Sequence, residues 1–282
     1  MTKKYVIKSN GGEELFSGEK VYESARRVGA SEQLAKEISG IIEKKAFPGI
    51  KTSEIFRQAR QMLKQETPGA ALKFNLKKAI GKLGPTGFPF EKYIGEILSS
   101  QGYQIKLNQI IPGLCCEYEI DFIAQKDSFA YIGECKYRNL FDGKVHTKDA
   151  LANYARFLDI NKGNFFKNNK LKSLLVTNTK FTSRAVNYSQ CAGVELLGWR
   201  YPGNRGLEYL IESQKLYPIT VLPSLNKYLA EVFSANGIML ARDLLDKNRT
   251  IKLTNLPEKK LNLLFKQARL LLFHKDAIDS GC

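Results

Sequence analysis

Apolar residues in the first part of the chain occur in short alternating runs and then at helical spacing. The run KYVIKSNGGEELF predicts two strands about the turn Asn10-Gly11-Gly12, because Asn and Gly accept the positive φ of tight hairpins. Thr52 is expected to be the N-cap of a helix. Two helical stripes are predicted: Ile55, Phe56, Ala59, Met62 and Leu63, then Leu72, Leu76, Ala79, Ile80 and Leu83. The breaker cluster GPTGFP, at residues 84–89, predicts a domain boundary.

The middle of the chain mixes strand and helix patterns. Phe90–Gln101 has helical spacing and is followed by Gly102. Two β-rich runs, YEIDFIA and FAYIGECKY, flank the polar turn Gln125–Ser128, and LKSLLVTN and VELLGW predict two further strands. Lys148–Leu158 and Ser183–Cys191 are expected to be helices. Helices before, between and after strands predict a mixed α/β core.

From about Pro218 onward the pattern is helical, with LNKYLAEVF, ARDLL and KKLNLLFKQARLLLF as expected helices. The runs ANGIMLARDLL and LTNLPEKKLNLLF resemble the paired helices of helix-hairpin-helix DNA-binding domains, where a turn presents backbone amides to phosphate. A helical bundle used for packing or dimerisation explains the same pattern equally well. We therefore expect three parts, residues 1–84, 85–215 and 216–282.

The composition excludes several classes of protein. Of the 282 residues, 43% are hydrophobic, and no run approaches the roughly 18 apolar residues that a membrane helix needs. The N-terminus has no secretory pattern, so the protein is expected to be cytoplasmic. Its five cysteines form no CxxC pair, which argues against a zinc site. With only two histidines, metal chemistry would depend on carboxylates, which favour Mg²⁺ or Mn²⁺.

The charge indicates a polyanionic partner. The formal net charge is +16, and the release of counterions from phosphates drives basic proteins onto nucleic acid. Solubility alone, or an acidic membrane surface, would also explain the charge. However, the basic residues are interspersed with Tyr and Phe and form no polybasic tail. Nucleic acid is therefore the partner that we expect.

The two central β-rich runs carry the candidate chemistry. Ile132, Glu134 and Lys136 point to one face of their strand, because side chains alternate with a period of two. If the hairpin closes around the polar turn, Asp121 lies directly or diagonally opposite Glu134, within reach of a shared Mg²⁺ or Mn²⁺. Such a metal would polarise a scissile phosphate, and Lys136 would orient or deprotonate a water or stabilise the developing charge.

The spacing D-x12-E-C-K resembles the PD-(D/E)xK signature of restriction-type nucleases. GFPFEKYIGEILSSQGY and VTNTKFTSRAVNYSQCAGVELLGW resemble the opening helix and the closing strand, helix and strand of Mrr-like restriction endonucleases, so the resemblance spans about Gly87–Trp199. It implies a restriction-endonuclease-like mixed sheet flanked by helices, with Glu91 joining Asp121, Glu134 and Lys136. Ile120 replaces the usual Pro. The alternative is an exposed strand bearing an ordinary Glu/Lys pair, with Glu91 a solvated helix charge.

The run VIKSNGGEELFSGEKV, with Thr52 opening a later helix, resembles the ATP-cone, a small nucleotide-sensing domain, over residues 1–84. The resemblance implies that ATP or dATP binds as a regulatory ligand. The contacting residues that it implies are Val6, Lys8, Glu14, Lys20, Val21 and Thr52. Ser9 stands where this family often has a basic residue. The alternative is a small hairpin-and-helix domain with a basic surface.

Together these patterns predict a divalent-metal-dependent endonuclease for double-stranded DNA that is regulated by ATP or dATP. Because a duplex has two strands to cut, a homodimer or higher homo-oligomer is expected. One alternative is an ATP-responsive DNA-binding regulator without cleavage activity, and another is a nuclease for branched DNA or RNA. A ribonucleotide-reductase repressor would need a zinc ribbon, which this cysteine pattern cannot build.

Overall fold

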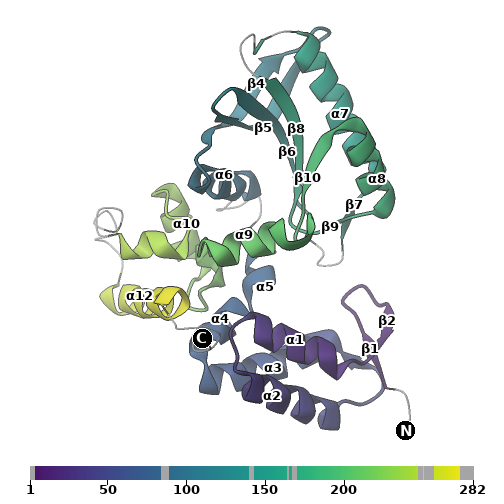
Figure 1. The fold of residues 1–282 in the computed structure, drawn as a ribbon. Helices are drawn as coiled ribbons and strands as arrows, with labels where there is room; N and C mark the ends of the chain where they lie inside the picture. Colours follow the sequence, from purple (N-terminus) through teal and green to yellow (C-terminus); the bar gives the residue numbers. More distant parts are fainter. Residues whose placement is uncertain are drawn as a thin grey trace, which may run out of the picture. The chain divides into compact units, whose positions relative to one another are not determined.

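The computed structural model describes residues 4–83, 89–139, 143–163, 165–166, 170–246, 250 and 257–273, and the structural statements below concern these residues. The chain forms two compact units, Met1–Ile80 with Tyr217–Cys282, and Gly81–Leu216 (Figure 1). The expected three-part division stays a prediction, because compactness alone does not separate functional modules. Most of the breaker cluster at residues 84–89 lies outside the described residues.

The middle unit is built on a five-stranded mixed sheet with the strand order β10-β8-β6-β5-β4. β4, β5 and β6 are antiparallel neighbours, whereas β6, β8 and β10 run parallel. The strands are β4 (Gln104–Pro112), β5 (Glu117–Lys126), β6 (Phe129–Lys136), β8 (Lys170–Thr177) and β10 (Val194–Leu197). The sheet with its flanking helices confirms the mixed α/β class.

Helices flank this sheet on both sides (Figure 1). α6 packs against β4 and β5, whereas α7 packs against β8 and α8 against β10. The smaller elements of the unit are a parallel two-stranded ladder, a 3₁₀ helix and a short α-helix. The bounds are α6 (Phe90–Ser100), β7 (Lys144–Val145), α7 (Thr147–Lys162), β9 (Lys180–Phe181), α8 (Ser183–Ala192), η1 (Gly203–Arg205) and α9 (Leu207–Ser213). One apolar cluster joins Ile160 of α7 to Ile123 and Ile132 of the sheet, which fixes α7 over that face.

The expected elements of this unit are present, one turn differs, and the structure adds elements that were not predicted, which are β4, β7, β9, η1 and α9. β4 was not predicted, because its residues alternate between exposed and half-buried positions and include polar side chains, as suits the edge of a sheet. The polar turn is also tighter than expected. Lys126 pairs with Phe129, so the hairpin closes on Asp127 and Ser128 alone, and Asp127 adopts a positive φ of 52°.

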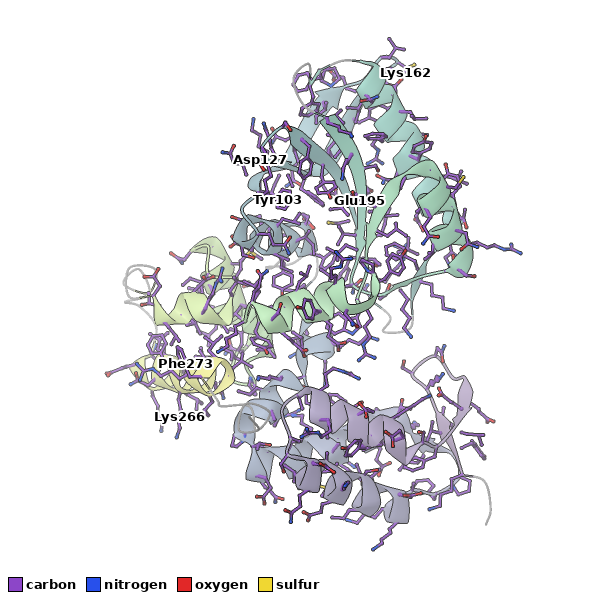
Figure 2. All side chains as sticks on the ribbon, in the orientation of Figure 1. Tyr103, Asp127, Lys162, Glu195, Lys266 and Phe273 are labelled. Carbon is purple, nitrogen blue, oxygen red and sulfur yellow. The ribbon has the colours of Figure 1, made fainter. Side chains whose placement is uncertain are left out.

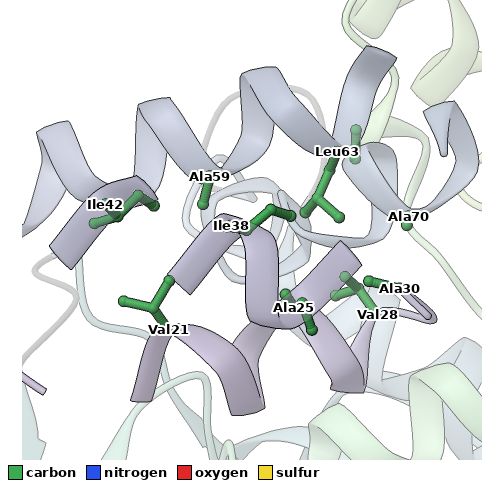
Figure 3. Close-up of a cluster of buried hydrophobic side chains, with 11 residues drawn as sticks. Val21, Ala25, Val28, Ala30, Ile38, Ile42, Ala59, Leu63 and Ala70 are labelled. Carbon is green, nitrogen blue, oxygen red and sulfur yellow. The ribbon is translucent and has the colours of Figure 1, made fainter. Parts of the chain in front are cut away.

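The N-terminal part of the other unit combines a three-stranded sheet, in the order β2-β1-β3, with five helices. The strands are β1 (Tyr5–Ile7), β2 (Glu13–Leu15) and β3 (Ile50–Lys51). The helices are α1 (Gly18–Arg27), α2 (Glu32–Lys45), α3 (Thr52–Glu66), α4 (Pro68–Lys73) and α5 (Leu76–Ile80). Val21, Ile38, Ile42 and Leu63 belong to their shared apolar core (Figure 3). The predicted hairpin about Gly11 is confirmed.

Three details of this part differ from expectation. The second predicted helical stripe is divided, because Leu72 lies in α4, Leu76, Ala79 and Ile80 lie in α5, and Leu83 lies outside both helices. Thr52 is the first residue of α3, and the N-cap is Lys51, which makes no side-chain capping bond. β3 was not predicted, because two residues carry no periodic signal. Its pairing with β1, through Val6 and Ile50, places Thr52 directly after a strand that borders the hairpin.

The C-terminal part of the same unit is helical, as expected, with η2 (Ile219–Val221), α10 (Lys227–Ala235), η3 (Ala241–Leu245) and α12 (Glu258–Phe273). The expected helix ARDLL is a 3₁₀ helix. The LTNL segment that opens the second run resembling a helix-hairpin-helix domain lies outside the described residues. α12 packs against α4, and the Thr220 hydroxyl donates to the Ala79 carbonyl at 2.9 Å. The two ends of the chain are thereby joined in one unit.

One close contact sets the spacing of the β5–β6 hairpin. Gly133 pairs with Phe122 across the two strands. A Cβ added at Gly133 would lie 2.0 Å from the tip of the Phe122 ring. Phe122 is fully buried, so the ring has no free space to move into. Gly133 does not adopt a positive φ. Glycine is therefore required here by packing and not by backbone conformation.

We expect Gly133→Ala to lower the free energy of unfolding of the middle unit by about 1–3 kcal/mol, as overpacking does. Trp199, the chain's single tryptophan and buried in this unit, reports that transition in a urea titration. In a Phe122→Leu background, which removes the ring tip, the same substitution should cost less. Equal costs in both backgrounds would refute the contact.

Candidate functional site

Asp121 and Glu134 lie side by side where β5 and β6 end their pairing. The last paired residues are Phe122 and Gly133, so the same register brings Asp121 next to Glu134. The backbone N–H of Cys135 donates to Asp121 Oδ2 at 2.6 Å, which fixes that carboxylate against β6. The expected position of Asp121 opposite Glu134 is therefore present in the structure.

Glu134 is the centre of an ion-pair network. It is 8% exposed, and Lys136 Nζ lies 2.5 Å from its Oε1. Arg156, on α7, forms an ion pair with the other carboxylate oxygen. Two cations thus compensate one nearly buried carboxylate, as burial of a charge requires.

The ionised form of the Asp121 carboxyl is disfavoured in the folded protein. Burial raises the pKa of its carboxyl to about 6, and the negative charges of Glu134 and Glu91 add to this effect. The Cys135 hydrogen bond and the Lys136 charge act in the opposite direction. Glu91, in the first turn of α6, is therefore close enough to influence Asp121. Three carboxylates and one lysine that the sequence singled out share one electrostatic environment.

The donor set suits a hard cation that keeps part of its water shell. Mg²⁺ is commonly held by one or two carboxylates, with water completing its coordination, and Asp121 and Glu134 supply two. Burial, with the charges of Glu134 and Glu91, raises the pKa of Asp121, and a cation beside this carboxylate would favour its ionised form. Among the described residues, no cluster of three or more His, Cys, Asp or Glu side chains is arranged to hold a metal by itself.

Sequence reasoning missed Arg156. Asp149, Asn153, Arg156 and Ile160 follow one another at intervals of three or four, so they occupy one face of α7. Asn153 and Ile160 of that face are buried. Polar residues on the helix face that also carries Ile160 were the signal that could have indicated Arg156, because a buried polar side chain needs a partner. Asn153 has one in Ser173, at 2.8 Å.

The chain that follows Lys136 is held by side chains at the end of β8. The Thr177 hydroxyl donates to the Lys136 carbonyl at 2.7 Å. The Asn178 side chain accepts from the Arg138 N–H at 2.8 Å and donates to its carbonyl at 2.9 Å. These bonds fix the direction in which the chain leaves the site, and the sequence alone did not indicate them.

A second group of singled-out residues lines a cavity of about 220 Å³ in the N-terminal part of the other unit. Val6, Glu14, Lys20, Val21 and Thr52 all border it. The sixth, Lys8, reaches the same place indirectly, because Glu14 forms ion pairs with both Lys8 and Lys20. The five bordering residues come from β1, β2, α1 and α3, and Lys8 directly follows β1.

The cavity has an aromatic wall that the sequence reading assigned to the core or overlooked. Phe56 and Phe74 both border it, and their rings are stacked with centroids 4.6 Å apart. Apolar and aromatic walls with a few convergent polar groups are typical of small-molecule sites. The charged residues of the cavity are Glu14 and Lys20, which form an ion pair with each other.

Fold and sites together define a mixed α/β protein with a carboxylate–lysine site on its central sheet. Residues 217–272 match the family model described as AF1548-like, C-terminal. A protein of Archaeoglobus fulgidus (strain ATCC 49558), named only as uncharacterized, is 40% identical over 152 residues, which cover 53% of this chain and 82% of the relative. The chain belongs to the AF1548-like family.

Solved structures extend this comparison. A crystal structure of AF1548, titled a protein of unknown function, is 32% identical with a TM-score of 0.55, covering 64% of this chain and 96% of that one. VC1899 from Vibrio cholerae is 15% identical at a TM-score of 0.31, covering 70% and 54%. The MspJI restriction endonuclease is 11% identical at 0.29, covering 74% and 42%. The two lower scores carry no argument about activity.

The described helices also bear on membrane association. None of them combines the length and the apolar character needed to cross a bilayer.

We expect Asp121→Asn to stabilise the metal-free protein at pH 8. Because the pKa of Asp121 is above that of an unfolded chain, the folded state holds the proton more tightly, so this carboxyl costs stability above about pH 6. The gain should be about 1–2 kcal/mol, reduced by partial exposure, and should disappear towards pH 4. Urea titrations of Trp199 fluorescence in EDTA measure it.

Glu119→Gln is the matched control, because Glu119 is an exposed acid on the same strand. It should leave the pH profile unchanged. An Asp121→Asn protein that is no more stable than wild type at pH 8 would contradict the unfavourable charge at Asp121.

Proposed function

We propose that this protein is a divalent-metal-dependent DNA endonuclease, in which Asp121 and Glu134 hold Mg²⁺ or Mn²⁺. The observation that carries the proposal is the pair of adjacent carboxylates with Lys136 beside them. A net charge of +16 supplies affinity for nucleic acid. Double-stranded DNA is the proposed substrate, and cutting both strands calls for a homodimer or higher homo-oligomer.

The chain's own residues would divide the work as follows. Asp121 and Glu134 would hold the cation, which would supply positive charge to polarise the scissile phosphate. Lys136, whose ammonium lies 2.5 Å from Glu134, would orient the attacking water or stabilise charge that develops on the phosphate. Glu91 adds negative charge at the same place and strengthens the attraction for the cation.

One observation favours a second candidate function, a DNA-binding regulator without cleavage. Arg156 already forms an ion pair with Glu134, so the carboxylate has cationic partners without any metal. A network of this kind can be purely structural. The two functions differ in the role of Lys136, which is chemical in the first and only compensates charge in the second.

We expect Lys136→Ala to lower metal-dependent nicking or linearisation of supercoiled plasmid by about 100-fold or more, as loss of a group that assists proton transfer does. DNA affinity should persist. Lys106→Ala, which removes an exposed lysine of β4, should cut normally. Branched DNA and RNA, assayed beside the plasmid, would separate a nuclease with another substrate from the regulator.

A second measurement does not depend on turnover. Mg²⁺ or Mn²⁺ should raise the melting temperature of wild type, because a ligand that binds only the folded state stabilises it. Asp121→Asn should abolish the rise. Intact substrates in every assay, no metal-dependent shift and retained DNA binding would favour the regulator.

We further propose that the N-terminal part is an ATP-cone-like module, in which ATP or dATP binds and regulates the protein. The support is the cavity that gathers Val6, Glu14, Lys20, Val21 and Thr52. The stacked rings of Phe56 and Phe74 offer an apolar wall for an adenine. Lys20, in the first turn of α1, offers positive charge for phosphate beside the N–H groups of that helix start.

We expect Lys20→Ala to weaken ATP binding by about tenfold, since a charge-assisted hydrogen bond to phosphate is lost. Titration calorimetry with ATP and with dATP measures the effect and ranks the two nucleotides. The control is Lys36→Ala on α2, where an exposed lysine pairs with Glu32 outside the cavity. Equal affinity in wild type and Lys20→Ala would remove Lys20 from the site.

A further inference from the structure

A separate cavity of about 260 Å³ lies where the two ends of the chain meet. It is bordered by α3, by α4, by the segment that follows η2 and by α12. Its walls are therefore built from both sequence segments of one compact unit. None of its lining residues belongs to the cavity that borders Lys20.

The charged lining residues of this cavity are all cations. Arg60 and Lys64 come from α3 and Lys266 from α12. Within the part of the chain that the structure describes, none of the three has an acidic partner. Three uncompensated cations around one hollow create a positive potential that an anion with several charges would relieve.

The rest of the lining is mostly apolar and rigidly placed. Leu72 is buried on α4. Gln267 accepts from the Ser224 N–H at 3.3 Å and donates to its hydroxyl at 2.8 Å, which ties α12 to the segment after η2. The cavity thus combines a mostly apolar lining with three cations. A compatible ligand pairs an apolar body with negative charge, as a nucleotide unit does.

A hollow along α12 continues this surface. Lys266 and Leu270 border both the cavity and the hollow, and the hollow adds Arg269, Phe265 and Phe273. Phe273 is 69% exposed, and Figure 2 shows Lys266 and Phe273 on α12. Exposed aromatic rings interspersed with cations are the features by which proteins bind single strands, because bases stack on the rings while cations hold the phosphates.

We propose that the cavity and the hollow along α12 form one binding surface for single-stranded nucleic acid. Arg60, Lys64 and Lys266 hold consecutive phosphates, and Phe273 stacks with a base. This assignment rests on the nucleic-acid partner of the proposed function but not on cleavage. A single strand suits the surface better than a duplex, since duplex bases are already stacked and cannot reach a ring.

The test is equilibrium binding of a fluorescein-labelled 12-nucleotide strand to the full chain in EDTA, where metal-dependent cleavage does not occur. The triple variant Arg60→Gln, Lys64→Gln, Lys266→Gln should bind about tenfold or more weakly at low salt. Its plot of log affinity against log salt should be shallower by about 2, at roughly 0.7 per lost phosphate contact. The matched control is Lys44→Gln, Lys45→Gln, Lys260→Gln, with three exposed lysines of the same unit.

A second variant protects the test against misfolding. Phe273→Ala removes an exposed ring, so the fold should be unaffected, and strand affinity should fall about fivefold or more. Tyr228→Ala, which removes a 61% exposed ring of α10, should bind as wild type does. Loss of affinity in the triple variant and in Phe273→Ala, but in neither control, supports the surface.

Other results would overturn it. Triple and control variants with equal affinity and equal salt slope would show that these cations do not contact the strand. If the triple variant weakened binding of a 12-base-pair duplex as much as binding of the single strand, specific recognition of single strands would be excluded. Loss of AMP binding in the triple variant, with strand binding intact, would assign the cavity to a free nucleotide. Plasmid cleavage is measured independently, so failure here leaves the nuclease proposal standing.

Discussion

The site on the central sheet depends on one electrostatic constraint, which is that two carboxylates lie side by side at the end of a strand pair. Glu134 tolerates its near-complete burial because Lys136 and Arg156 both contact it. Asp121 accepts a hydrogen bond from the Cys135 backbone N–H, and burial raises the pKa of its carboxyl to about 6. The raised pKa means that folding disfavours the ionised form of Asp121. A cation bound as in the proposed function would offset that cost.

The fold keeps the two carboxylates together through the register of β5 and β6. A slip of one residue would turn one of them to the opposite face of the sheet. The Phe122 ring over Gly133 opposes such a slip, because any other residue beside the ring would collide with it. α7 adds the second restraint, since Ile160 packs on the sheet while Arg156 reaches Glu134. Packing and charge therefore select the same register.

The sequence predicted the parts of this arrangement that depend on local pattern. The alternation along β6 placed Glu134 and Lys136 on one face, and the polar turn placed Asp121 opposite. It did not predict Arg156, because partners that lie far apart in sequence depend on how α7 docks. The edge strand β4 and the two-residue β3 carried too little apolar periodicity to be recognised. Thr52 was expected to be the N-cap of α3 but is its first residue, and a difference of one residue is common at helix ends.

The charge of the protein is unevenly divided between its two units. The middle unit, residues 81–216, carries 18 Lys and Arg against 13 Asp and Glu, whereas the rest of the chain carries 26 against 15. Most of the excess positive charge therefore lies outside the unit that contains Asp121 and Glu134. A carboxylate site repels phosphate until a cation neutralises it, so under the proposed function the attraction for nucleic acid has to come from elsewhere in the protein. The unit that joins the two ends of the chain can supply that attraction, and it also contains the cavity beside Lys20. Under the proposed function, a nucleotide bound there would add negative charge to the unit proposed to attract nucleic acid, and this charge would weaken that attraction.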